Sequence, residues 1–250
     1  MVLNTRVREY YCSNPLMVSS PFGGVDGIRR DLVLDVFERL GIGVAGRKIL
    51  DVGCGRGYVG QVVRDQGGDY TGLDFAVSRT GLRQAVGDAA SLPFPDAAFD
   101  GILCLDALEH FPDIDQAVAE FRRVLRASGF AFLSAPNYAN IAGIVKKYCE
   151  TFGRYEANTW APFRNWQPQE LEQALTARRV RRAFRRAGFV RIRRMGYAGE
   201  AGLGLFPWIE HPSMPEAIKF RLQRLFNTVG PAVVRVWPNA SLHSFWKFDG

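Results

Sequence analysis

Residues 49–57 read Ile-Leu-Asp-Val-Gly-Cys-Gly-Arg-Gly, and this stretch decides the fold. Its apolar first half predicts a buried strand, and its three glycines predict a sharp turn in which the backbone approaches a ligand closely. A helical pattern follows at once, and the first turn of a helix offers free N–H groups. A strand, a glycine-rich turn and a helix in this order indicate the cofactor-binding end of a parallel α/β sheet.

Strand and helix patterns alternate along the rest of the chain. The strands are expected at 48–53, 70–75, 84–87, 99–107, 129–135, 190–197 and 241–248. Their continuous apolar runs, such as GILCLDAL at 101–108, are typical of strands that are covered on both faces. We therefore expect an α/β fold with a Rossmann-like seven-stranded sheet. Six strands are parallel, the last is antiparallel, and helices lie on both faces.

The chain is expected to form a single domain over residues 1–250 with an added cap. Residues 1–44 form an N-terminal cap and 45–137 the cofactor-binding core, while 138–168 and 199–238 are insertions over the acceptor site. Helices are expected at 27–40, 114–125, 168–187 and 215–228. The acceptor pocket is expected from segments rich in aromatic residues and loops, namely Tyr10-Tyr11, 19–24, 138–166 and 206–211.

Composition excludes several classes of protein. With 47% hydrophobic residues the chain has ample material for a packed core, so disorder is not expected. No apolar run approaches the roughly 18–20 residues that span a bilayer. The N-terminal MVLNTRVREYY lacks the apolar run of a signal peptide, so a cytoplasmic protein is expected. The cysteines have no metal-ligand spacing, so we expect reduced thiols and no metal site: Cys12, Cys54, Cys104 and Cys149.

The formal net charge of +7 raises the question of an acidic partner. Nine arginines lie between Arg178 and Arg194, and we interpret them as a solvated helix face followed by an edge strand. A basic face for nucleic acid, anionic lipid or a phosphorylated acceptor is the less favoured alternative. No stacking platform interleaves the arginines, which disfavours nucleic acid in particular. The oligomeric state is not specified by the sequence.

Two cofactors fit the glycine turn. Gly55, Gly57 and Gly60 satisfy the GxGxxG pattern of dinucleotide-binding proteins, and Asp74 lies about twenty residues further on. However, Asp51 stands at the strand end just before the first glycine. A carboxylate there opposes a pyrophosphate and suits a ligand with ammonium and sulfonium groups. Asp51 therefore favours S-adenosylmethionine.

The motif ILDVGCGRG resembles the first motif of the class I methyltransferases, in the subgroup that includes small-molecule and ubiquinone-pathway enzymes. The resemblance continues in order through TGLDFA (71–76), GDAASLPFPDAAFD (87–100), ILCLDALEHF (102–111) and FRRVLRASGFAFLSAPN (121–137), with a weaker match at 187–196. It implies S-adenosylmethionine as cofactor and methyl transfer as activity.

Cofactor contacts follow from the resemblance and agree with residue chemistry. It implies that Asp51 and the turn of Gly53, Cys54 and Gly55 lie against the cofactor, with Cys54 contributing its backbone only. The acid of the second motif, Asp74, holds the ribose hydroxyls, since one carboxylate accepts two hydrogen bonds from vicinal groups. Its alternative role is that of a helix N-cap or turn residue.

The adenine ring is expected to meet the third motif. The resemblance implies that Asp88 reaches the adenine amino group with the Ala89 amide nearby, although an aspartate after a short strand is also ordinary turn chemistry. Phe75 and Leu105 are expected to supply apolar walls for adenine and for the methionine side.

His110 is the candidate catalytic residue. It follows the fourth strand, whose carboxyl end faces the cofactor crevice, and imidazole titrates near neutral pH, as a general base requires. The alternative is a structural Glu109-His110 pair that orients the cofactor or caps a helix. His211 is a second candidate base, while His243 is expected to pack in the last strand.

The sequence thus predicts methyl transfer from S-adenosylmethionine to a small or medium-sized acceptor, with oxygen as the expected atom. Two other classes of function stay open. One is a nucleotide-dependent oxidoreductase on the same glycine turn, and the other is a catalytically silent methyltransferase fold that acts as an interaction module.

Overall fold

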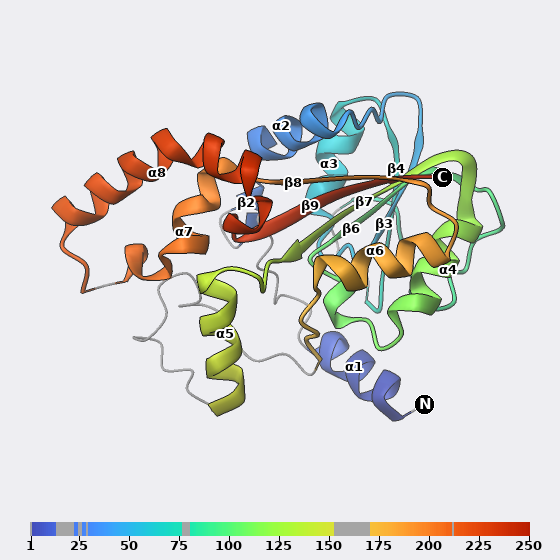
Figure 1. The fold of residues 1–250 in the computed structure, drawn as a ribbon. Coiled ribbons are helices and arrows are strands. Elements are labelled where there is room, and N and C mark those ends of the chain that lie inside the picture. The colour runs from blue at the N-terminus through green and yellow to red at the C-terminus, as the bar shows by residue number, and fades with distance from the viewer. Residues whose placement is uncertain are drawn as a thin grey trace.

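The computed structural model describes residues 2–13, 23–24, 27–28, 30–76, 81–152, 171–211 and 213–250. A seven-stranded sheet in the order β5-β4-β3-β6-β7-β9-β8 forms its centre (Figure 1). The strands are β3 (Lys48–Val52), β4 (Asp69–Asp74), β5 (Gln84–Val86), β6 (Phe99–Leu105), β7 (Leu125–Pro136), β8 (Arg191–Gly196) and β9 (His243–Asp249). In this sheet β9 runs antiparallel to β7 and to β8, and every other pair of neighbouring strands is parallel. The expected seven-stranded sheet with an antiparallel last strand is confirmed.

The register brings the ends of the parallel strands to one edge of the sheet. Val52 of β3 pairs with Leu73 of β4, and Leu105 of β6 pairs with Ser134 of β7. The turn after β3 and the polar residues that end β4 and β6 therefore meet at this carboxyl edge, where ligands bind in open α/β sheets.

Helices cover both faces of the sheet, as expected. On one face, α2 (Arg30–Leu40) and α3 (Tyr58–Asp65) share a core cluster with side chains such as Ile49 and Phe132. On the other face, α4 (Ile114–Val124) and α6 (Ala177–Arg186) pack on a cluster that includes Leu50 and Trp246. The alternation of Ile49 and Leu50 between the two clusters follows from the two-residue period of a strand.

The remaining elements lie around the carboxyl edge. They are α1 (Val2–Ser13), the short hairpin β1 (Gly23–Gly24) and β2 (Gly27–Ile28), the 3-10 turns η1 (Leu108–His110), η2 (Ala198–Glu200), η3 (Pro207–Glu210) and η4 (Pro238–Ala240), and the helices α5 (Ile141–Phe152), α7 (Ala201–Leu205) and α8 (Glu216–Val236). Figure 1 shows α5, α7 and α8 beyond the ends of β6 and β7. Among the described residues, no helix has the length and apolar character needed to cross a membrane.

Several expected boundaries were wrong. The first expected helix begins at Arg30 and not at 27, because Gly27–Ile28 pairs with Gly23–Gly24 in the hairpin. The strand expected from 129 begins at Leu125, directly after α4. The last strand is shifted to His243–Asp249. The helix expected to end at 228 continues to Val236 with Pro231 inside it.

The helix expected over 168–187 is also wrong over its first half. Residues 171–176 form no helix, and α6 starts at Ala177 after the N-cap Thr176, whose side chain accepts a hydrogen bond from the Arg179 N–H. Residues 168–170 lie outside the described part of the chain, as do residues 19–22 and 153–166 of the expected acceptor segments. The proposed division into cap and core stays a prediction.

Candidate active site

The glycine turn connects β3 to α3 in a left-handed backbone conformation. Gly53, Gly55 and Gly57 have φ values of 74°, 50° and 70°, a region that other residues rarely adopt. A Cβ on Gly53 would lie 2.5 Å from the Cβ of Ala107. The turn therefore packs directly against the loop that follows β6.

Asp74 ends β4 and binds the same turn. Its Oδ2 accepts a hydrogen bond of 2.7 Å from the Gly55 N–H, and its Oδ1 accepts one of 2.7 Å from the Phe75 N–H. Burial raises the pKa of this carboxyl, and the backbone donors oppose that shift. A carboxylate has about four acceptor sites. The backbone N–H groups of Gly55, Phe75 and Ala76 use three of them, so Asp74 keeps capacity for a further donor such as a ribose hydroxyl.

Asp51 lies beneath the turn, within β3. It is 3% exposed, and its Oδ2 accepts a hydrogen bond of 2.8 Å from the hydroxyl of Tyr70 on β4. Burial raises the pKa of Asp51 to about 7, although the hydrogen bond from Tyr70 opposes the shift. A nearby cation would favour the ionised form. The two acids Asp51 and Asp74 give this end of the sheet a negative character, which fits a cationic cofactor and opposes a pyrophosphate.

Cys54 faces inward. Its Sγ lies 3.6 Å from Nε2 of Gln84 and occupies the space where a Cβ on Gly72 would be, 2.6 Å away. Burial raises the pKa of the thiol, so it stays protonated and unreactive. Contact of the Cys54 backbone with the cofactor stays a prediction.

The loop after β5 lies next to Asp74, because the Gly87 N–H donates to the Asp74 carbonyl at 3.0 Å. In this loop Oδ1 of Asp88 accepts a hydrogen bond of 2.8 Å from the Ala90 N–H, which is the turn chemistry named above as the alternative. Ala89 is buried, and Phe75 is half-buried. Contact of Asp88 with adenine stays a prediction.

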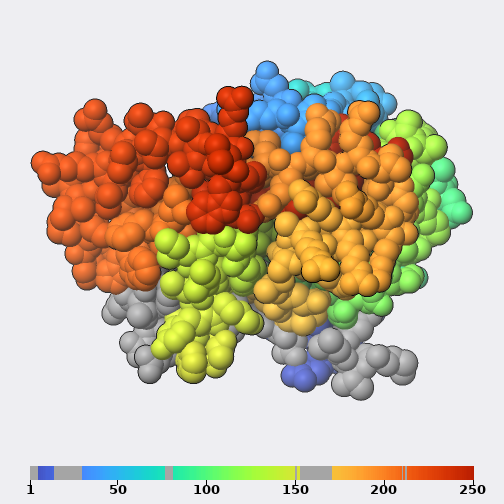
Figure 2. Space-filling view, in the orientation of Figure 1, coloured from blue at the N-terminus to red at the C-terminus, as the bar shows by residue number. Residues whose placement is uncertain are grey.

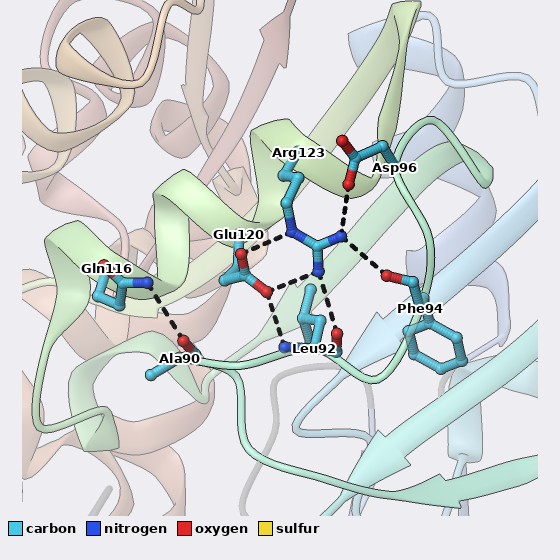
Figure 3. A network of polar contacts seen from close by, with 7 residues as sticks. All are labelled: Ala90, Leu92, Phe94, Asp96, Gln116, Glu120 and Arg123. Atoms are coloured by element: carbon cyan, nitrogen blue, oxygen red, sulfur yellow. Dashed lines mark hydrogen bonds and ion pairs between the residues drawn. The ribbon is translucent and has the colours of Figure 1, made fainter.

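Arg123 of α4 holds this loop in place, a role that sequence reasoning missed. Its guanidinium binds the side chains and carbonyls shown in Figure 3, namely Glu120, Asp96, Leu92 and Phe94. Glu120 also accepts a hydrogen bond from the Leu92 N–H at 2.8 Å. An arginine offers five donors in a fixed planar geometry, and here they fasten the candidate adenine loop to a helix of the core.

At the end of β6 the backbone turns sharply. Leu105 is half-buried, and Asp106 has a φ of 47°, a left-handed conformation that is uncommon for a residue other than glycine. The Asp106 N–H donates to the Ser134 carbonyl, and the Ser134 hydroxyl donates to Oδ1 of Asp106 at 2.9 Å. Residues held in such conformations are frequent at functional sites. Asp106 was not among the expected site residues.

His110 ends the turn η1, and its side chain is largely buried. Its Nδ1 lies 2.7 Å from the carbonyl oxygen of Leu171. A carbonyl only accepts hydrogen bonds, so Nδ1 carries the proton and Nε2 keeps its lone pair. Burial lowers the pKa of His110 below its ordinary value of 6.5. The imidazole is therefore neutral at pH 7 with Nε2 as a free base, which is the protonation state that a general base requires.

Residues 171–175 clamp the His110 loop. The Gln173 N–H donates to the Glu109 carbonyl at 2.9 Å, and Nε2 of Gln173 donates to the Phe111 carbonyl at 2.7 Å. These bonds place the Leu171 carbonyl at His110, and they explain why this segment is extended where a helix was expected. A helix would have used the same N–H groups internally.

A cluster of buried titratable groups surrounds His110. Lys146 of α5 forms an ion pair with Glu172, which also accepts a hydrogen bond of 2.6 Å from the Tyr138 hydroxyl. Glu109 is 1% exposed, and burial together with the nearby Asp106 carboxylate raises its pKa well above its ordinary range. Oε1 of Glu109 lies 3.9 Å from Nε2 of His110.

The other candidate residues near the acceptor side differ in their environments. The ring of Tyr11 on α1 lies 5.8 Å from that of His110, so the N-terminal helix reaches the candidate base. His243 is an ion-pair partner of Glu200 at 3.0 Å, and this carboxylate raises the pKa of His243 to about 9 against the effect of burial. A His243 that is protonated at neutral pH cannot act as a general base there. His211 accepts a hydrogen bond from the Ser213 N–H.

The structure thus brings the expected site residues to one edge of the sheet, with the glycine turn at its centre. Asp51 and Asp74 lie beneath and beside the turn, the His110 loop packs on Gly53 through Ala107, and the Asp88 loop adjoins Asp74. Lys146 and Glu172 were missed because they lie 26 residues apart in a region without a recognisable motif. Among the described residues, no group of three or more potential ligands could hold a metal ion.

Comparison with known proteins agrees with this geometry. Residues 50–133 match the family model of a methyltransferase domain. A ubiquinone biosynthesis O-methyltransferase of Pseudomonas aeruginosa is 32% identical over 109 residues, 38% of this chain and 47% of the relative. A fatty-acid O-methyltransferase of Mycolicibacterium smegmatis is 38% identical over 101 residues, 35% of this chain and 36% of the relative. The chain thus spans less than half the length of these two relatives.

The fold extends further than the sequence match. A solved SAM-dependent methyltransferase from Archaeoglobus fulgidus superposes with a TM-score of 0.61 over 92% of this chain and 96% of its own, at 16% identity. Residues 50–133 therefore resemble a methyltransferase domain, and the chain shares the fold of a solved SAM-dependent methyltransferase.

Proposed function

We propose that the chain transfers a methyl group from S-adenosylmethionine to a hydroxyl oxygen of a small or medium-sized acceptor, with His110 as the general base. The observation that carries the proposal is the neutral imidazole of His110, with its lone pair on Nε2, in a loop packed against the glycine turn. The two sequence relatives named above are O-methyltransferases, which supports oxygen as the accepting atom.

The residues present fit this cofactor. Asp74 keeps acceptor capacity for a ribose hydroxyl, and the buried Asp51 has a raised pKa that a cationic ligand would relieve. The same two acids disfavour the pyrophosphate of the oxidoreductase alternative. When bound, S-adenosylmethionine supplies the methyl group on a sulfur atom that leaves with the electron pair of the broken bond.

The chain's own residues then act on the acceptor. A protonated hydroxyl is a weak nucleophile, and Nε2 of His110 would take its proton and so make the acceptor oxygen a stronger nucleophile. The Leu171 carbonyl holds the imidazole in the required tautomer through Nδ1. Positive charge that develops on the imidazole is stabilised by the Glu172 carboxylate, which raises the pKa of His110 against the larger effect of burial.

The test is transfer of labelled methyl to a panel of hydroxylated acceptors. Wild type should methylate one class at oxygen, and His110→Ala should lower turnover by roughly 10²–10⁴ while cofactor affinity changes little. In wild type, activity should fall as the pH drops below the pKa of His110, which lies under 6.5, and this limb should vanish in the variant. His211→Ala is the matched control and should retain turnover.

Equal turnover of wild type and His110→Ala would refute the role of His110 and favour an amine or acidic phenol acceptor, for which proximity alone suffices. A collapse of cofactor affinity in His110→Ala would instead assign the residue to the cofactor site, and Tyr11 would be tested next as the base.

A further inference from the structure

Helix α8 is the longest helix of the described chain, and only one side of it packs on the protein. Gly230 is buried with the Ala198 carbonyl oxygen 2.7 Å from its Cβ position, and Phe226 packs over Gly202 of α7. Figure 2 shows the side chains of α8 in orange-red at the left end of the molecule, away from the sheet. The opposite side of the helix therefore faces solvent.

An apolar row runs along the edge between the packed side and this exposed side, and its Leu222 is half-buried. The row consists of residues spaced alternately four and three apart, which align on one side of a helix: Ile218, Leu222, Leu225, Val229, Ala232 and Val236. Ile218 is 47% exposed, Leu225 52% and Val236 87%. At 1.5 Å per residue the row is about 27 Å long. Scattered exposed apolar residues are normal, but a continuous row of this length marks a binding surface.

Arginines border the row. Arg221, Arg224 and Arg235 are exposed, and none of the three forms an ion pair with a carboxylate within the described part of the chain. Glu216, at the first turn, is the only acid in the sequence of α8. Trp237, which is 43% exposed, follows the row directly after Val236, whereas Phe220, which is 61% exposed, lies on another side of the helix. The surface is thus apolar, aromatic and positively charged.

We propose that this surface, defined by the apolar row and the three arginines, binds an anionic lipid bilayer. Apolar and aromatic side chains enter the boundary between headgroups and acyl chains, and arginines beside them contact anionic headgroups while their stems stay in the apolar layer. A second copy of the chain fits less well. A two-fold antiparallel pairing of α8 would bring the Arg221 side of one helix to the Arg235 side of the other, and like charges repel.

The proposal does not depend on the chemistry of the active site, and vesicle binding tests it directly. In a flotation assay, the protein is mixed with vesicles of phosphatidylcholine alone or with vesicles that also contain about 30% phosphatidylglycerol. Each mixture is measured at low and at high salt. Wild type should bind the anionic vesicles at low salt, and binding should weaken at high salt. The triple variant Arg221→Gln, Arg224→Gln and Arg235→Gln should partition roughly 100-fold less, since each basic residue near an anionic surface contributes about a factor of five.

Matched variants distinguish binding through this surface from nonspecific effects of net charge and exposed apolar area. Neutralising Arg178, Arg182 and Arg185 on α6 removes the same charge and should leave binding unchanged. Leu225→Ser with Val229→Ser should reduce binding even where the arginines are intact, whereas Val86→Ser with Val190→Ser, which alters exposed valines elsewhere, should not. Circular dichroism confirms that each variant is folded.

Two outcomes overturn the proposal. One is no binding of wild type to anionic vesicles at low salt, or an equal loss in the α6 variant. The other is a wild-type dimer in light scattering that Leu225→Ser with Val229→Ser converts to a monomer without any vesicle binding, which would assign the row to a second copy of the chain.

Discussion

Cofactor binding is expected to depend on pH through the buried carboxyl of Asp51, whose pKa is raised to about 7. About a tenth of the molecules then carry the charged form at pH 6, and about nine tenths at pH 8. If the ammonium and sulfonium groups of the cofactor bind the ionised form, affinity rises about tenfold over this range, or about 1.4 kcal/mol. Binding at pH 6 should also release a proton.

Asp51→Asn isolates this effect, because an amide oxygen still accepts the hydrogen bond from Tyr70 but carries no charge. Calorimetric titrations at pH 6, 7 and 8, in buffers of different ionisation enthalpy, give both the affinity and the number of protons released. The variant should bind with one weak affinity from pH 6 to 8. An identical pH dependence in wild type and variant would refute the reasoning.

The same carboxyl affects stability. Its pKa in the folded protein lies above the ordinary value of 3.8, so the unfolded chain loses this proton first as the pH rises. The fold is therefore destabilised progressively from about pH 4 to pH 7, by at most about 4 kcal/mol. Asp51→Asn should raise the melting temperature at pH 8 and leave it nearly unchanged at pH 4.

Further predictions concern the glycine turn and the basic helix. Gly53→Ala forces a strained φ of 74° and places a methyl group 2.5 Å from Ala107, so it should destabilise the fold by about 2–5 kcal/mol. Gly43→Ala, with no atom within 4 Å of its Cβ position, is the control, and equal melting temperatures would contradict the clash. Reversal of Arg178, Arg182 and Arg185 to Glu should leave turnover intact at moderate salt, and a salt-sensitive loss of nucleic-acid binding in this variant would revive the polyanion alternative.

The sheet could be predicted because its signals are local. Apolar runs end in glycine or acidic residues at the carboxyl edge, so the strands and the positions of Asp51, Asp74 and His110 follow from motif order. Element ends were less certain because tertiary contacts decide them. Pro231 normally ends a helix, yet α8 continues past it, with Gly230 packed against Ala198.

Side-chain partners could not be predicted, because they join segments far apart in the chain. The clamp on His110 comes from Leu171, 61 residues away, and the Arg123 network joins residues about 30 positions apart. Neither pairing leaves a pattern in one sequence. Asp88 shows a related limit, since the sequence allowed both an adenine contact and a turn, and the structure has the side chain on the Ala90 N–H.

The most direct test of the central claim is calorimetric titration of S-adenosylmethionine into wild type and Asp74→Ala. Asp69→Ala, at the opposite end of β4, serves as the control. Wild type and the control should bind one cofactor per chain with equal affinity. Asp74→Ala should bind about 10- to 150-fold more weakly, the effect of about 1.5–3 kcal/mol for lost hydrogen bonds to a carboxylate. Absence of binding to wild type, or equal affinity in Asp74→Ala, would contradict placement of the cofactor at the glycine turn.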